Sequence, residues 1–149
     1  MAYGLRAAVK AATGAAYVVM PLEGLWWVPD MADFDPHDKS NWLWTMMICL
    51  PDAVTGLDTA DVIATVTDRK ALAAGSKVRF ETFAEGAAAQ ILHIGPYADE
   101  AADIETLHHF IADQGHALAG KHHEIYLSDA RKTDPAKLRT IIRQPVTAA

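Results

Sequence analysis

Apolar residues recur at helical spacing in three segments of the chain. The helices predicted from them cover residues 2–12, 58–73 and 99–114. Gly14 and Gly115 follow the first and third segments, where a glycine commonly ends a helix. Asp58 is a candidate N-cap of the second helix, and Gly75 is expected to close it.

Runs of β-branched and aromatic residues between these segments predict strands. AAYVVM and GLWWV flank Pro21 and predict two strands, followed by a long acidic loop. WLWTMMICL, residues 42–50, is apolar on both faces, which favours a central strand. VRFETF and AAAQILHI are joined by a short connection that contains a glycine, and together they predict a β-hairpin.

The last third of the chain predicts two more strands. KHHEIYLSD alternates between its two faces, and LRTIIRQPV is expected to be a last strand that Pro145 ends. Asp134 and Pro135 between them form an N-cap and first-turn pair. The predicted fold class is therefore α+β. The order strand, helix, strand, strand in the second half recurs in the first half without its opening strand, which suggests a duplicated module.

Length and charge narrow the class of protein. A chain of 149 residues with 51% hydrophobic residues predicts a single domain over 1–149. The net charge of −6 disfavours nucleic acid as a partner. The single cysteine, Cys49, fits a reducing compartment and predicts a cytoplasmic protein; within an apolar run it is expected to be structural. No segment approaches the roughly 18 apolar residues that a membrane span needs.

Alternation along KHHEIYL places His122, Glu124 and Tyr126 on one face of the predicted strand and His123 on the other. If the first face is buried, loss of solvent raises the pKa of Glu124 unless a cation or hydrogen bonds compensate, which makes Glu124 a candidate acid or base. An exposed glutamate on an edge strand is the alternative, and the pattern alone leaves both open.

Four tryptophans lie close together in two of the predicted strands. Alternation separates Trp26 from Trp27 and puts Trp42 on the same face as Trp44. We expect at least one of each pair to line a cavity, although most tryptophans serve only as core. Aromatic walls beside one carboxylate suit planar or cationic organic molecules. Gly95–Pro96 predicts a tight turn that sets the direction of Tyr97.

Other chemistries are disfavoured by the pattern of residues. His122, Glu124 and His93 could in principle surround an ion, but no established ligand spacing is present, and we predict no metal. Ser128 and Asp129 lie near His123, yet Ser128 lacks the surroundings of a nucleophile.

Six segments of the chain resemble the GyrI-like family of small-molecule-binding proteins, in order over about residues 15–146. They are PLEGLWW, WLWTMMI, KVRFETFAEG, ILHIGPYADE, GKHHEIYLSD and RTIIRQPV. In particular they look like the branch described as cyclopropanoid cyclopropyl hydrolases. The resemblance implies duplicated strand-helix-strand-strand modules, an antiparallel sheet with helices on one face, and a ligand cleft that a central glutamate, here Glu124, faces. Family members begin with a strand that is apparently missing here, so a homodimer or an incomplete pocket is implied.

The resemblance also implies an activity. Members of this branch add water to the strained cyclopropane ring of DNA-alkylating natural products, without a cofactor. By analogy we expect Glu124 to be the catalytic base, acting on a planar hydrophobic small molecule. The side chains expected to bind that molecule are Trp26, Trp27, Trp44, His93, Tyr97 and Tyr126. The alternatives are a non-catalytic module that sequesters drugs and a gyrase-interacting protein.

Overall fold

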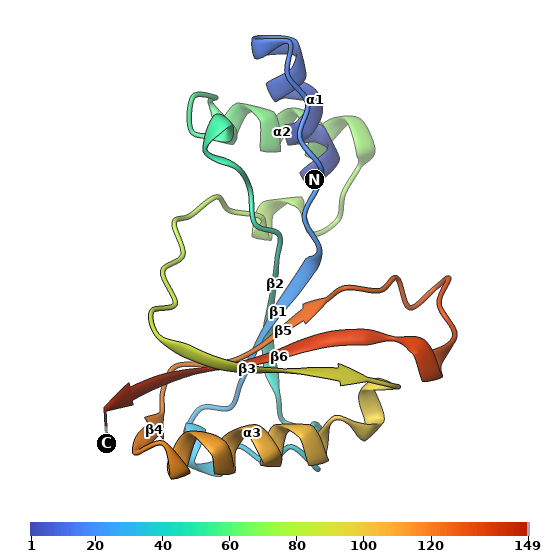
Figure 1. The fold of residues 1–149 in the computed structure, drawn as a ribbon. Helices are drawn as coiled ribbons and strands as arrows, with labels where there is room; N and C mark the ends of the chain where they lie inside the picture. The colour runs from blue at the N-terminus through green and yellow to red at the C-terminus, as the bar shows by residue number, and fades with distance from the viewer. Residues whose placement is uncertain (149) are drawn as a thin grey trace. The chain divides into compact units, whose positions relative to one another are not determined.

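The computed structural model describes residues 1–148, which form two compact units. We call the first the helical unit; it consists of Met1–Met20 and Ile48–Phe83. The second, the sheet unit, consists of Pro21–Met47 and the chain from Ala84 onwards. Figure 1 shows the elements of both units. The prediction of a single domain over residues 1–149 stays a prediction.

The helical unit is built on α1 (Ala2–Thr13) and α2 (Thr59–Lys70). Its core is formed by Leu5, Val9 and Val54, three apolar residues that are almost fully buried. The Asp58 side chain accepts a hydrogen bond from the backbone N–H of Asp61, which confirms the predicted N-cap of α2. Two short 3₁₀ helices, Asp52–Val54 and Gly75–Lys77, complete the unit.

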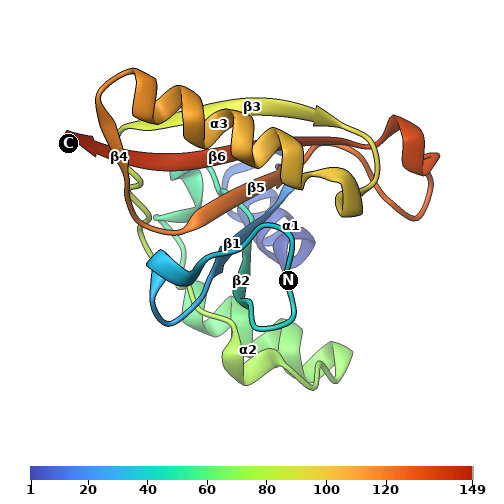
Figure 2. The same cartoon turned by 90° about the horizontal axis from the view of Figure 1, so that it is seen from below.

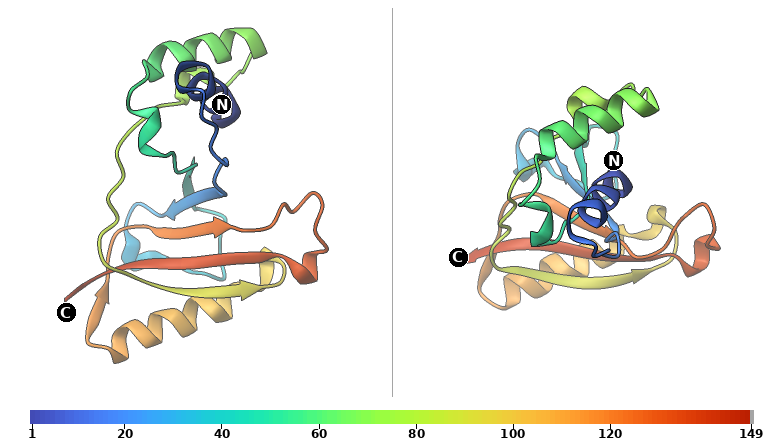
Figure 3. Two further views of the ribbon diagram at one scale, coloured as in Figure 1. Left: turned by 45° about the horizontal axis from the view of Figure 1, so that its top comes forward. Right: turned by 90° about the horizontal axis from the view of Figure 1, so that it is seen from above.

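The sheet unit contains a six-stranded sheet in the order β2-β1-β5-β6-β3, with β4 paired to β6, and each of these pairs is antiparallel. Figure 3 shows β6 lying between β5 and β3. The strands are β1 (Leu22–Trp27), β2 (Leu43–Met47), β3 (Ala88–Ile94), β4 (His116–Leu118), β5 (His122–Tyr126) and β6 (Arg139–Ala148).

One face of this sheet is covered by α3 (Ala101–Asp113), as Figure 2 shows. The apolar residues at helical spacing in α3, Ile104, Leu107 and Ile111, pack on Ile142 of β6, and all four are nearly inaccessible to solvent. Burial of side chains of this size stabilises the fold by about 2 kcal/mol each. The predicted α+β fold with an antiparallel sheet is thus confirmed, while the duplication of modules stays a prediction.

Several predicted strands are placed differently by the structure. Residues 42–50 were expected to be central, but β2 lies at the edge of the sheet and leaves Leu43 and Trp44 exposed. The predicted hairpin around Gly86 is wrong, because residues 78–87 form no strand and β3 pairs with β6. Residues 15–20 also form no strand.

The helix and strand ends differ from prediction at three further points. Ala71, in the left-handed conformation with φ 46°, ends α2 before Gly75. β6 continues through Pro145, whose carbonyl oxygen accepts the N–H of Ala119, so this proline does not end the strand. The three-residue strand β4 was not predicted, since so short a run carries little periodic signal.

Candidate functional site

Glu124 lies in the middle of β5, on the face of the sheet that α3 covers. Directly paired residues on neighbouring strands share a face, and Glu124 is paired with Ile142, which belongs to the core beneath α3. On its other side Glu124 is paired with Gly24 of β1. The Glu124 side chain is buried, with 3% of its surface exposed. An exposed edge-strand glutamate, the alternative left open by the sequence, is therefore not what the fold contains.

Two side chains, Tyr126 and His122, form hydrogen bonds with the Glu124 carboxylate, and Trp26 extends the network. The Tyr126 hydroxyl donates to Glu124 Oε2 at 2.7 Å, and Tyr126 Oη in turn accepts the indole N–H of Trp26 at 3.1 Å. His122 Nε2 lies 3.2 Å from Glu124 Oε1. Period-2 alternation along β5 brings His122, Glu124 and Tyr126 to one face, as predicted, and the antiparallel pairing adds Trp26 from β1.

Gly24 makes room for this network. A Cβ atom built on Gly24 would lie 2.7 Å from the Trp26 indole nitrogen and 3.0 Å from the Tyr126 hydroxyl oxygen. Any larger residue opposite Glu124 would therefore displace the hydrogen bond between those two side chains. The glycine within PLEGLWW thus has a packing role that its sequence context alone did not reveal.

A group of aromatic rings packs around His122 and Trp26. Trp42 stacks on Phe34 with ring centroids 4.5 Å apart and lies 5.8 Å from the rings of both Trp26 and His122. On the other side of the network, Tyr97 meets Tyr126 edge to face at 5.6 Å. These separations are those of attractive aromatic pairs, and they surround the carboxylate with apolar, weakly solvated groups.

A second buried carboxylate and a lysine adjoin these rings. Glu100 is fully buried, and its Oε2 accepts a hydrogen bond from Lys39 Nζ at 3.0 Å. The same ammonium group donates to the carbonyl oxygen of Tyr97 at 3.2 Å and lies 5.0 Å from the centroid of the Trp42 ring. Glu100 Oε1 is buried without a hydrogen-bond partner in the described part of the chain. The site therefore holds two carboxylates and one cation.

The two carboxylates differ in their affinity for a proton. Burial raises the pKa of Glu124, but the hydrogen bonds with His122 and the Tyr126 hydroxyl and the charge of Lys39 more than compensate, so the net shift of this pKa is downward. Burial and the charge of Glu124 raise the pKa of Glu100 to about 7, although Lys39 opposes this shift. At neutral pH Glu124 is ionised, while Glu100 exchanges a proton readily. Such a separation between the pKa values of two neighbouring carboxyl groups is typical of acid and base pairs in enzymes.

Among the predicted site residues, the structure brings Trp26, Tyr97 and Tyr126 together around Glu124. Trp44 is paired with Trp26 across β1 and β2, on the same face, but is 61% exposed at the edge of the sheet. Trp27 points to the opposite face, where Lys121 Nζ lies 3.4 Å from its ring centroid.

His93 does not face the Glu124 carboxylate with a free nitrogen. Its Nδ1 lies 2.7 Å from Asp103 Oδ2 and its Nε2 lies 3.2 Å from the carbonyl oxygen of Pro96. With both ring nitrogens engaged and 4% of its surface exposed, His93 holds the turn that carries Tyr97. A direct contact of His93 with the substrate, which the resemblance implied, would require these bonds to break.

Three residues of this site, Phe34, Lys39 and Glu100, were not predicted from the sequence, and Trp42 was considered only as a member of a pair with Trp44. Glu100 lies at the start of a predicted helix, where an acidic residue is common and gives no sign of a site. Trp42 precedes β2 and so leaves the alternation that grouped it with Trp44. A lysine within an otherwise acidic loop was the one available signal for Lys39.

The structure agrees with the sequence on His123 and corrects the expectation for Cys49. His123 lies on the other face of the sheet, where its nitrogens are 2.9 Å from Glu23 Oε2 and 2.8 Å from Glu85 Oε1. It therefore takes no part in a triad with Ser128, whose hydroxyl accepts the backbone N–H of Arg139. Cys49 is exposed, so it is not the buried structural thiol that its apolar neighbours suggested.

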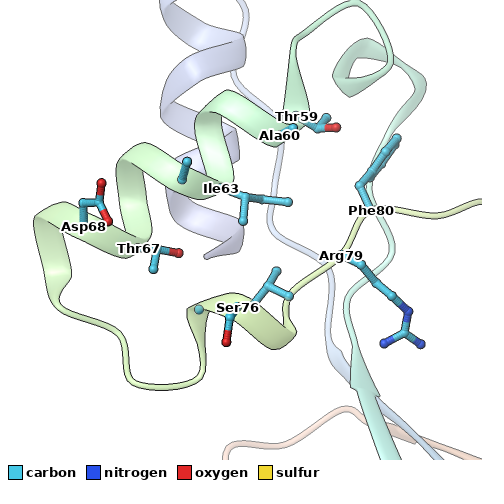
Figure 4. Close-up of a pocket in the computed structure, with 11 residues that line it drawn as sticks. Thr59, Ala60, Ile63, Thr67, Asp68, Ser76, Arg79 and Phe80 are labelled. Carbon is cyan, nitrogen blue, oxygen red and sulfur yellow. The ribbon is translucent and has the colours of Figure 1, made fainter.

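Neither a metal-binding cluster among the described residues nor the cavity in the helical unit includes Glu124. Within residues 1–148, no three His, Cys, Asp or Glu side chains are arranged to hold a metal ion. A cavity of about 510 Å³ lies in the helical unit, between α2 and residues 75–80 (Figure 4), and contains none of the predicted site residues. The buried polar network, rather than this cavity, carries the unusual chemistry. None of the described helices is long and apolar enough to cross a membrane.

The fold defines the class as an α+β protein, and a buried carboxylate among aromatic rings is typical of sites for small molecules. A scan against protein families matches residues 5–147 to the GyrI-like small molecule binding domain. The chain belongs to the GyrI-like family, and the resemblance found in its sequence is confirmed at this level.

Solved structures from Listeria innocua are similar to this chain. The crystal structure of an uncharacterized conserved protein is 31% identical, with a TM-score of 0.79, over 97% of this chain and 76% of that one. The crystal structure of a hydrolase is also 31% identical, with a TM-score of 0.78, over 97% of this chain and 75% of that one. A comparison with curated proteins finds no match.

Proposed function

We propose that the sheet unit binds planar aromatic molecules beside Glu124 and adds water to a strained cyclopropane ring in them, as a detoxifying hydrolase. The single observation that supports this most is the Glu124 carboxylate, buried among Trp26, Tyr97 and Tyr126. Similarity to a Listeria innocua hydrolase supports the reaction class, and the resemblance of the motifs to cyclopropanoid hydrolases supports the substrate.

The proposed reaction uses both carboxylates of the site. Glu124 orients a water molecule and accepts its proton as the oxygen bonds to the cyclopropane carbon. The carbon–carbon bond of the ring breaks, and its electron pair moves through the conjugated system to the carbonyl oxygen. Glu100, whose pKa is raised to about 7, would protonate that oxygen. The sum is substrate plus water, with no cofactor.

Burial of Glu124 has a consequence for how a substrate would reach it. With 3% of its surface exposed, Glu124 meets a ligand only after a neighbouring side chain moves. Tyr97, Tyr126 and Trp26 are only partly buried, so they are the rings that a planar molecule would meet first. Inserting a flat substrate between such rings would replace ring–ring contacts by ring–substrate contacts at little net cost.

The test of this function is turnover of a cyclopropanoid compound by the wild-type protein and by Glu124→Gln. We expect the wild-type protein to form a ring-opened product that has gained one water molecule, and Glu124→Gln to lose at least about a hundredfold in rate. Glu105→Gln, which changes an exposed glutamate on α3, is the matched control. Equal turnover by folded Glu124→Gln would remove Glu124 from the mechanism.

A second candidate function is sequestration without turnover. The lowered pKa of Glu124 favours it, because a weakly basic carboxylate serves as a counter-charge more readily than as a general base. In that case one protein molecule would protect one ligand molecule, and the ligand would be recovered unchanged after denaturation. Interaction with gyrase and assembly into a homodimer stay predictions.

A further inference from the structure

Lys39 holds the position that a cationic ligand would be expected to take. A cation is bound best where a carboxylate, a carbonyl oxygen and the face of an aromatic ring converge. Lys39 Nζ meets all three: Glu100 Oε2 at 3.0 Å, the carbonyl oxygen of Tyr97 at 3.2 Å and the Trp42 ring at 5.0 Å from its centroid. The protein thus fills its own cation position with a side chain.

The ammonium group of Lys39 is held in place by hydrogen bonds, but its side chain remains accessible to solvent. Its partner Glu100 is completely buried, whereas the Lys39 side chain is 36% exposed. Two of its three N–H groups are accounted for by Glu100 and Tyr97. The third can be offered to an arriving molecule that carries a hydrogen-bond acceptor.

We propose that Lys39 determines which molecules the site accepts: it selects neutral planar molecules that accept a hydrogen bond, and it excludes planar cations. This inference rests on the function proposed above and narrows its substrate class. Without Lys39, the carboxyl groups of Glu100 and Glu124 and the same aromatic rings would attract cations. One side chain therefore separates a site for neutral molecules from a site for cationic ones.

Lys121 provides a matched control within the same unit. It also lies over a tryptophan, with Nζ 3.4 Å from the Trp27 ring centroid, but Trp27 is on the face of the sheet opposite Glu124. Lys39→Met and Lys121→Met change the net charge of the protein equally. A difference between the two variants therefore reports the position of the charge, not its amount.

The experiment compares two probes of nearly the same shape, acridine and N-methylacridinium, at a pH at which acridine is neutral. Acridine accepts a hydrogen bond at its ring nitrogen, whereas the methylated probe carries a positive charge there instead. Calorimetric titration gives the affinity of each probe for the wild-type protein, Lys39→Met and Lys121→Met. Lys39→Gln repeats the loss of charge with a donor kept for Glu100, in case the methionine variant does not fold.

We expect wild-type protein and Lys121→Met to prefer acridine, and the ratio of the two affinities to shift toward the cation by at least about tenfold in Lys39→Met. Charges within about 5 Å of each other near a protein surface interact strongly enough for such a shift. An unchanged ratio, with both probes still bound, would overturn the role of Lys39 and leave the proposed binding site intact. If neither probe binds the wild-type protein or Lys39→Met, the role of Lys39 and the proposed site are overturned together.

Discussion

Replacing Glu100 with glutamine should reveal the free energy that this buried carboxylate costs the fold. The pKa of Glu100 is raised from 4.5 to about 7, so between these values the folded protein retains a proton that the unfolded chain has released. In this window stability falls as pH rises, by about 1.4 kcal/mol for each pH unit. Across the whole window the loss approaches about 3 kcal/mol. Glu100→Gln removes the titrating group and should not show this loss.

The assay is urea unfolding of the wild-type protein and Glu100→Gln at a series of pH values on both sides of the window. We expect the difference in unfolding free energy to shift in favour of the variant as pH rises from 4.5 to about 7, and to level off above it. Asp99→Asn removes an exposed carboxylate from the same turn and controls for net charge. A difference that stays constant with pH would refute the reasoning, because it would mean that Glu100 titrates alike in both states.

Three other changes test the surroundings of Glu124. Gly24→Ala should lower the unfolding free energy by about 1–3 kcal/mol, since its Cβ would meet the Trp26 indole at 2.7 Å; an unchanged urea midpoint would contradict this. Tyr126→Phe removes a hydrogen bond to a carboxylate and should cost about 2 kcal/mol in the same assay. Burial lowers the pKa of His123, but two glutamates raise it more, so the stability that His123 adds should be full below pH 6.5 and decline above it. The unfolding free energy of the wild-type protein should therefore approach that of His123→Gln as pH rises. A difference between the two proteins that grows with pH would contradict this.

The parts of the fold that depend on local periodicity could be predicted from the sequence. Alternation along β5 was enough to place Glu124 and Tyr126 on one face, because a strand has a fixed period of two. The same holds for α3, whose buried residues recur at helical spacing, and for the cap at Asp58, which needs only a side-chain oxygen near the helix start.

The parts that depend on pairing between distant segments could not be predicted. β3 pairs with β6 rather than with the segment before it, and nothing in the residues 78–87 reveals that choice. Lys39 and Glu100 are 61 residues apart, so their ion pair exists only once the sheet and α3 are assembled. The position of β2 at the edge likewise depends on strand order, because its apolar residues are equally compatible with a central strand.

The central claim, that this site adds water to a planar strained substrate, is tested most directly by product mass analysis in water enriched with heavy oxygen. The protein is incubated with a large molar excess of a cyclopropanoid compound. The compound is then extracted, and its molecular mass is measured by mass spectrometry. We expect many ring-opened molecules for each protein molecule, each carrying one heavy oxygen atom. Recovery of the intact compound, or of labelled product no faster than without protein, would contradict it.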